Sequence, residues 1–128
     1  MIVGIGTDLV DVKRIRESLE RHGDRFADKI LSKNEVLEFQ QCGERIKPHF
    51  LAKRFAAKEA TVKALGTGFR DGIQLHDIEV THTDKGKPEL TLSGAAKREQ
   101  QKLGVISTHI SISDEHEHAV AFVIMEKE

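Results

Sequence analysis

Hydrophobic and polar positions recur along this chain with two different periods, and these periods predict its elements. Residues 2–6 form a short run of apolar and small residues, typical of a buried strand, that ends near Asp8. Apolar residues then recur at helical spacing behind Asp11, which has the side chain of an N-cap. These apolar residues are Val12, Ile15 and Leu19. We therefore predict an opening strand followed by a helix.

Two more helices are predicted before the period changes. The S-x-x-E pattern of residues 32–35 is a capping box and predicts a helix over residues 33–42. Pro48 suits the first turn of a long helix over residues 48–65, and Gly66 suits its C-cap. This long helix carries one stripe of large apolar residues and one of alanines, so we expect it to be central.

The second half of the chain alternates with a period of two, which predicts strands. Strands 78–82 and 89–92 surround a turn. Ser93 is the N-cap candidate of a helix over 94–103, and strands 105–113 and 119–125 follow. The order is one strand, three helices, two strands, one helix and two strands. It predicts a single α+β domain over residues 1–128, with a mostly antiparallel sheet packed on the long helix.

Composition indicates which compartment and which kinds of structural site the protein can have. The chain has 128 residues, of which 38% are hydrophobic and 32% charged, enough for a core without disulfides. Cys42 is the only cysteine, which excludes an internal disulfide framework and Cys-based zinc sites. No apolar run has the length of a membrane span, and the start does not resemble a signal peptide. We expect a cytoplasmic protein without a membrane partner.

Charge is unevenly distributed along the chain. Residues 1–66 hold 13 Lys or Arg against 10 Asp or Glu, a net of +3, whereas residues 67–128 hold 7 against 11, a net of −4. A mildly basic first half suits an acidic partner. Nucleic acid is not expected as a partner, because the basic excess is small and Trp and Tyr are absent.

Three charged residues stand where the pattern expects apolar or small ones. Lys58 lies in the apolar stripe of the long helix, Glu59 lies between its two faces, and Asp8 ends a buried strand. A buried charge must be paired, hydrogen-bonded or bound to a metal. One interpretation is a structural pair between Glu59 and Lys63, one turn apart, with Asp8 only turning the chain. The other is that Asp8 and Glu59 bind Mg²⁺, which prefers oxygen ligands.

Three motifs, in this order, resemble the signatures of the 4′-phosphopantetheinyl transferases. They are Gly4-Ile5-Gly6-Thr7-Asp8, Phe55-Ala56-Ala57-Lys58-Glu59-Ala60-Thr61-Val62-Lys63 and His109-Ile110-Ser111-Ile112-Ser113. Each motif is weak alone, but their order and spacing, with Gly66-Thr67-Gly68 behind the second, are specific together. In length the chain is similar to the short bacterial branch of this family, the holo-[acyl-carrier-protein] synthases.

The resemblance implies a defined reaction. The 4′-phosphopantetheine arm of coenzyme A moves to a serine of apo-acyl carrier protein, adenosine 3′,5′-bisphosphate is released, and fatty acid biosynthesis is supported. By motif, Asp8 and Glu59 are the Mg²⁺ ligands, with Mn²⁺ as a substitute, and Lys63 is the third catalytic residue, directed at the pyrophosphate. A metal-held water or Glu59 itself accepts the proton of the serine hydroxyl, and the sequence leaves both open.

The resemblance also assigns contacts with coenzyme A. The candidates are Arg54, Gly66, Gly68, Lys87, Pro88, His109 and Ser111. The planar fork of an arginine suits phosphate, and glycines let backbone amides approach it. Several have a structural alternative. Gly66 could be a helix cap and His109 an ordinary strand residue. Arg54 and Lys87 could be solvated surface charges, as we expect for Arg45. His116 and His118 look like a metal pair but lack a third ligand in register, so we do not expect a metal there.

The first helix offers a docking surface for the acidic carrier protein. Arg14 and Arg21 share a face away from the apolar stripe, and Arg25 and Phe26 would extend this face if the helix continued past Gly23. The resemblance implies docking on this helix, with the arginine that matches Arg14 prominent. The alternative is an ordinary solvated helix face.

Assembly and the number of metal ligands follow from the resemblance too. Short members of the family form homotrimers with sites between subunits. Val10 stands where the longer, two-lobed members carry a second acid, so we expect two protein carboxylates in the site. The competing function is a non-catalytic module that binds coenzyme A or an acidic helix. Such a module would not need both Asp8 and Glu59.

Overall fold

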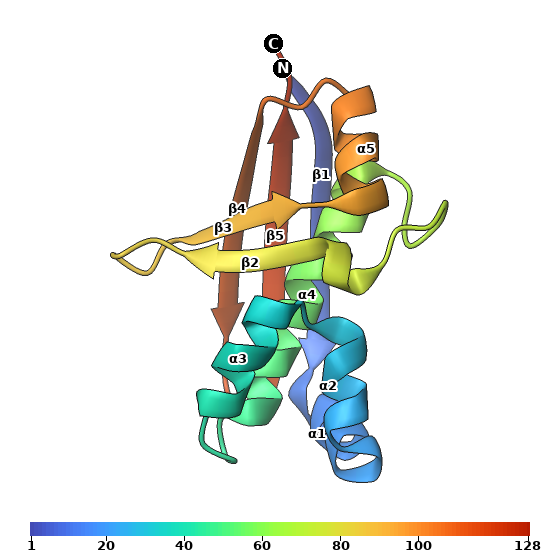
Figure 1. Cartoon of the computed structure of the whole chain (residues 1–128). Helices are drawn as coiled ribbons and strands as arrows, with labels where there is room; N and C mark the ends of the chain where they lie inside the picture. The colour runs from blue at the N-terminus through green and yellow to red at the C-terminus, as the bar shows by residue number, and fades with distance from the viewer.

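The computed structural model describes all 128 residues and shows two antiparallel sheets beside one long helix (Figure 1). In chain order the elements are β1 (Ile2–Asp11), α1 (Val12–His22), α2 (Asp24–Ile30), α3 (Lys33–Gln41), α4 (Lys47–Leu65), the 3-10 helix η1 (Leu75–Asp77), β2 (Ile78–His82), β3 (Pro88–Leu92), α5 (Gly94–Lys102), β4 (Ser107–Asp114) and β5 (His118–Glu126). The α+β class and the antiparallel pairing are confirmed, although the strands form two sheets rather than one.

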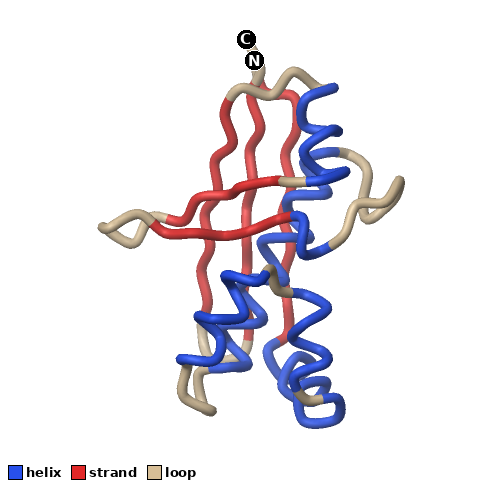
Figure 2. Tube along the Cα trace, in the orientation of Figure 1, coloured by secondary structure: helices blue, strands red, loops and turns tan.

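The larger sheet has the strand order β1-β5-β4, and the smaller one is the β2–β3 hairpin. Asp8 of β1 lies opposite Ala121 of β5, which lies opposite Ile112 of β4. Figure 2 shows the hairpin running across the direction of the three long strands. The hairpin contacts β4 through β3, and α4 contacts both sheets.

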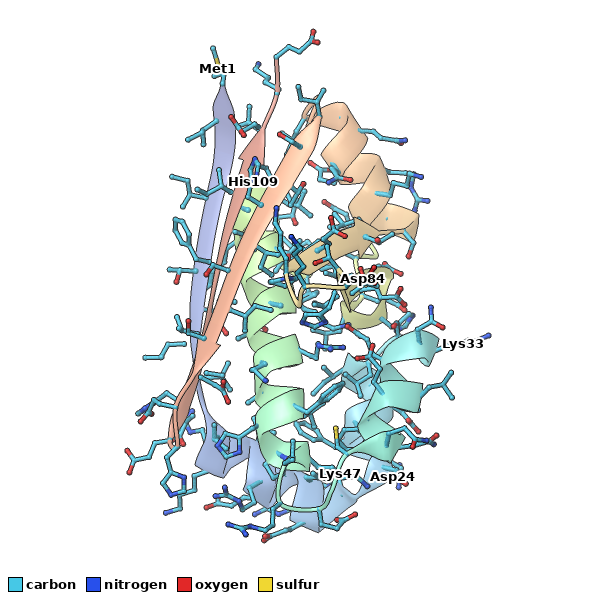
Figure 3. The ribbon with its side chains drawn as sticks, turned by 90° about the vertical axis from the view of Figure 1, so that its left-hand side faces the viewer. Met1, Asp24, Lys33, Lys47, Asp84 and His109 are labelled. Carbon is cyan, nitrogen blue, oxygen red and sulfur yellow. The ribbon has the colours of Figure 1, made fainter.

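All helices lie on one side of the three-stranded sheet, and no element covers its other side (Figure 3). The core lies between this sheet and α4, where residues such as Ala60, Ala121 and Val123 are fully buried. No helix here combines the length and the apolar character that crossing a membrane requires.

The predicted start and stop signals act as expected. Ser32 and Glu35 form both hydrogen bonds of a capping box at the start of α3. Asp11 Oδ1 accepts from the Lys13 amide at 2.9 Å and caps α1. Pro48 lies in the first turn of α4, and Gly66, with φ of +80°, ends that helix.

Three local predictions are wrong. The first strand extends to Asp11, because β1 pairs with β5 as far as the Asp11–His118 pair. Four helices, not three, precede β2, because Gly23 has a φ of +61° that ends α1 before Asp24 begins α2. Ser93 does not cap α5 with its side chain, which donates to the Asp77 carbonyl instead.

Candidate active site

The site is built on an unusually close approach between β1 and α4. A Cβ on Gly4 would overlap the carbonyl oxygen of Ala64, and one on Gly6 would overlap that of Ala60. The two glycines therefore let the strand lie directly on the alanine stripe of the helix. Because side chains alternate along a strand, Asp8 is the next residue of β1 that faces α4.

Asp8 meets a lysine from the last turns of α4. Lys63 Nζ lies 3.1 Å from Asp8 Oδ1 and donates to the Thr7 carbonyl at 2.9 Å. The side chain of Asp8 is largely buried, whereas that of Lys63 is half exposed. The ion pair of Lys63 is thus with Asp8, and the purely helical pair between Glu59 and Lys63 is not formed.

Glu59 is the third charged residue of this group. We call Asp8 and Glu59 the acidic pair, and Lys63 is its lysine. Burial raises the pKa of Glu59, and the negative charge of Asp8 raises it further, while Lys63 lowers it. A cation between the two carboxylates would offset their mutual repulsion. Their oxygen atoms are the donors that Mg²⁺ prefers, so this donor set fits the ion that the resemblance implies.

On its other side α4 carries an ion pair that the sequence pattern did not reveal. Lys58 Nζ is fully buried, lies 2.6 Å from Glu35 Oε1, and donates to the carbonyls of Leu75 and Ile78. Glu35 also accepts from the amide of Val80 at 2.9 Å. Burial lowers the pKa of Lys58, and Glu35 opposes that shift. Lys58 is therefore a structural link from α4 to α3 and β2.

Arg54 lies beside this pair and is almost entirely buried. Its Nη2 donates to Glu38 Oε2 at 3.1 Å, and its guanidinium lies over the Phe50 ring, 4.3 Å from the ring centre. Its Nη1 has no hydrogen-bond partner, with Glu35 Oε2 at 3.6 Å. Arg54 and Pro88 both line a small pocket of about 160 Å³.

Three of the predicted coenzyme A contacts line one larger pocket. Lys87, Pro88 and His109 surround a cavity of about 340 Å³ where β3 lies against β4. His109 Nε2 is 2.7 Å from Glu126 Oε1, and Figure 3 labels His109 on β4. Ser111 is exposed on the same strand and does not line this pocket.

The glycines behind α4 close the helix in this structure. The amides of Gly66, Thr67 and Gly68 all donate to the carbonyl of Val62, at 3.1 to 3.3 Å. Gly66 and Gly68 both have positive φ. These amides are therefore engaged in a helix cap, which is the structural alternative weighed for Gly66.

A single copy of the chain does not bring all the predicted metal and coenzyme A residues together. Asp8 faces α4, whereas His109 and Ser111 alternate with Ile110 and Ile112, which pack against the core. His109 and Ser111 therefore lie on the opposite side of the three-stranded sheet from the acidic pair.

The residues predicted for carrier docking lie on two helices. Arg14 and Arg21 are exposed on α1, and Arg25 is exposed on α2. Phe26 was a candidate to extend the face of Arg14 and Arg21, but it is half buried and packs against the core. The break at Gly23 causes this difference, because it turns α2 away from the line of α1.

A separate polar cluster lies in the β4–β5 turn. Ligand atoms of Glu115, Glu117 and His118 lie within 4.8 Å of one another, all on exposed side chains. Glu115 Oε1 and His118 Nδ1 are 2.9 Å apart. His116 is not part of this cluster, and its carbonyl contacts His49.

Comparisons with known proteins agree with this arrangement. A sequence model of the 4′-phosphopantetheinyl transferase superfamily matches residues 4–123. A holo-[acyl-carrier-protein] synthase of Halorhodospira halophila is 54% identical over 98% of each chain. The crystal structure of the holo-[acyl-carrier-protein] synthase from Neisseria meningitidis superposes with a TM-score of 0.91 at 43% identity, covering 99% of this chain and all of that one. The crystal structure of a Bacillus anthracis synthase in complex with coenzyme A (3′,5′-ADP) superposes with a TM-score of 0.84 at 40% identity. The match covers 100% of this chain and 99% of that one. The chain belongs to the 4′-phosphopantetheinyl transferase superfamily.

Proposed function

We propose that this chain is a holo-[acyl-carrier-protein] synthase, which transfers 4′-phosphopantetheine from coenzyme A to a serine of apo-acyl carrier protein. The observation that carries this function is the acidic pair with its lysine, placed by family motifs in a chain similar to named synthases over its whole length. The bound coenzyme A of the Bacillus anthracis relative supports the donor. Adenosine 3′,5′-bisphosphate is the second product.

Asp8 and Glu59 would hold Mg²⁺ in this function. The ion, when bound, would neutralise negative charge that develops on the pyrophosphate oxygens of the leaving group. Lys63, which already contacts Asp8, brings a further positive charge to the same place for the pyrophosphate. Glu59 is one candidate acceptor for the proton of the serine hydroxyl. A water held in the site is the other acceptor for the serine proton.

The phosphates of coenzyme A have two candidate regions. Arg54 keeps one buried nitrogen without a partner, which suits a phosphate oxygen reached through the small pocket. Lys87 and His109 line the larger pocket, with Pro88 between the two regions. Ser111, Gly66 and Gly68 remain predicted contacts.

The uncovered sheet face supports assembly of several copies. It exposes Ile5, Leu9, Val120 and Phe122, with Leu9 at 67% and Phe122 at 42% of their surface. A contiguous apolar face of this kind marks a protein interface. We propose the homotrimer that the resemblance implies, in which His109 of one copy and the acidic pair of another complete a site.

Replacement of Phe122 by aspartate should therefore prevent this assembly. A charge in the middle of the apolar face would be buried without a partner in the interface. We expect Phe122→Asp to elute as a monomer in size-exclusion chromatography with light scattering, and to lose transfer. Leu37→Asp, at an exposed apolar residue on α3, is the matched control and should assemble normally. A trimer of unchanged stability in Phe122→Asp would show that this face is not the interface.

Carrier docking is proposed on α1, through Arg14 and Arg21. Arg14→Glu should raise the KM for apo-acyl carrier protein about tenfold with little change in coenzyme A affinity, because it places like charges against an acidic partner. Added salt should weaken the wild type more than the variant. Arg98→Glu makes the same charge change on α5, which lies at the other end of the molecule from α1 (Figure 1). An equal rise in KM for both variants would contradict docking on α1.

The function itself is tested by incubation with apo-acyl carrier protein, coenzyme A and Mg²⁺. Mass spectrometry should show one phosphopantetheine added to the carrier serine. Binding of coenzyme A without transfer would favour the non-catalytic module instead. We place the reaction in the cytoplasm, where the carrier and coenzyme A are available.

A further inference from the structure

We propose that Glu126 is a positioning residue that fixes the ring of His109 for coenzyme A, an inference that rests on the proposed function. Glu126 Oε1 and His109 Nε2 are 2.7 Å apart. Glu126 lies outside the three motifs and beyond residues 4–123, which the superfamily model matches.

Strand pairing brings these two side chains together. His109 lies opposite Ile124, and Ser107 lies opposite Glu126. Residues two apart on a strand share a face, so Glu126 and His109 are diagonal neighbours on the uncovered face of the sheet. The Ser107 hydroxyl donates to the same oxygen at 3.4 Å. The carboxylate is therefore held by two side chains of β4.

This contact decides which ring nitrogen of His109 is available. An ionised carboxylate can only accept hydrogen bonds, so the proton of the contact belongs to Nε2. The hydrogen bond from His109 lowers the pKa of Glu126, which keeps the carboxyl ionised. Nδ1 is then the nitrogen left for a ligand. In the protonated ring, Nδ1–H is a donor for a phosphate oxygen, and Glu126 balances the ring's charge.

The neighbouring cation is consistent with an anionic ligand. His109 and Lys87 line the same cavity of about 340 Å³, from β4 and from the start of β3 respectively. A lysine ammonium and a histidine ring around one cavity suit the phosphates of coenzyme A. Without Glu126 the ring of His109 would rotate freely, since its side chain is about half exposed.

The test is a double-mutant cycle of Glu126→Ala and His109→Ala. Binding of adenosine 3′,5′-bisphosphate by calorimetry should weaken about threefold to tenfold in Glu126→Ala, with the KM for coenzyme A rising in step and kcat nearly unchanged. Glu126→Gln keeps an acceptor and should lose less. In the His109→Ala background, Glu126→Ala should have no further effect.

A matched control lies at the other end of the β4–β5 strand pair. Glu115 contacts His118 at 2.9 Å in a similar carboxylate–histidine pair, so Glu115→Ala should leave binding unchanged. Nitrogen chemical shifts of the His109 ring should show the proton on Nε2 in the neutral wild-type ring and a mixture of tautomers in Glu126→Ala. Equal weakening by Glu126→Ala with and without His109 would overturn the inference. A wild type that neither binds coenzyme A nor modifies the carrier would instead overturn the proposed function.

Discussion

Alanine at either Asp8 or Glu59 should reduce kcat/KM for transfer by about 100-fold or more while leaving the fold intact. Removal of one carboxylate halves the donor set for Mg²⁺ and, for Asp8, also frees Lys63 from its partner. Neither side chain is fully buried, so the cost in stability should be small. The measurement is the rate of carrier modification at saturating Mg²⁺, with circular dichroism as the check on folding.

Asp84→Ala is the control for this prediction. Asp84 is an exposed carboxylate in the β2–β3 turn, and its loss should not change the rate (Figure 3). Excess chelator should stop the wild type, and Mn²⁺ should partly restore it. Full activity of Asp8→Ala in excess chelator would exclude a metal held by the acidic pair.

Alanine at Gly6 should destabilise the protein by at least about 3 kcal/mol, the upper part of the range for overpacking. The added Cβ would overlap the Ala60 carbonyl and lie 2.8 Å from the Ala64 amide nitrogen. These are backbone atoms of a buried helix and cannot rotate away. The midpoint of thermal unfolding should fall by roughly 10 °C. Any folded fraction should also lose activity, because a displaced β1 moves Asp8 away from α4.

Gly43→Ala is the comparison for this substitution. A Cβ there meets nothing within 4 Å, and the residue does not have a positive φ, so stability should change little. If Gly6→Ala melted at the wild-type temperature, the close approach of β1 and α4 would not be required.

Much of the fold follows from local chemistry that a sequence displays. The capping box at Ser32 and the glycine at 66 mark helix ends because they satisfy backbone groups within a few residues. The break at Gly23 was less visible, because helical residues continue on both sides and only the positive φ separates the two helices. The full length of β1 depends on β5, more than 100 residues later, and no local pattern contains that pairing.

In the site, too, local patterns were predictable and long-range contacts were not. Asp8, Glu59 and Lys63 were identified by motif, which implied that they share one site. The partner of Lys63 was not predictable from helix spacing, which favours Glu59, because Asp8 comes from another element. The partner of Lys58 was also hidden, since Glu35 has a complete local role as a capping residue and its contact spans 23 positions. Glu126 could be found only from the register of β4 and β5.

The pair of Lys58 and Glu35 has a consequence for aggregation. A two-stranded sheet has two open edges, and an open edge invites a strand from another molecule. Lys58 donates to the carbonyl of Ile78, and Glu35 accepts from the amide of Val80, so the two side chains occupy two backbone groups along the free edge of β2. An ion pair thus takes the place of a neighbouring strand. A chain that lost both partners would leave the Ile78 carbonyl and the Val80 amide unpaired, which are the groups that a strand from another copy would bind.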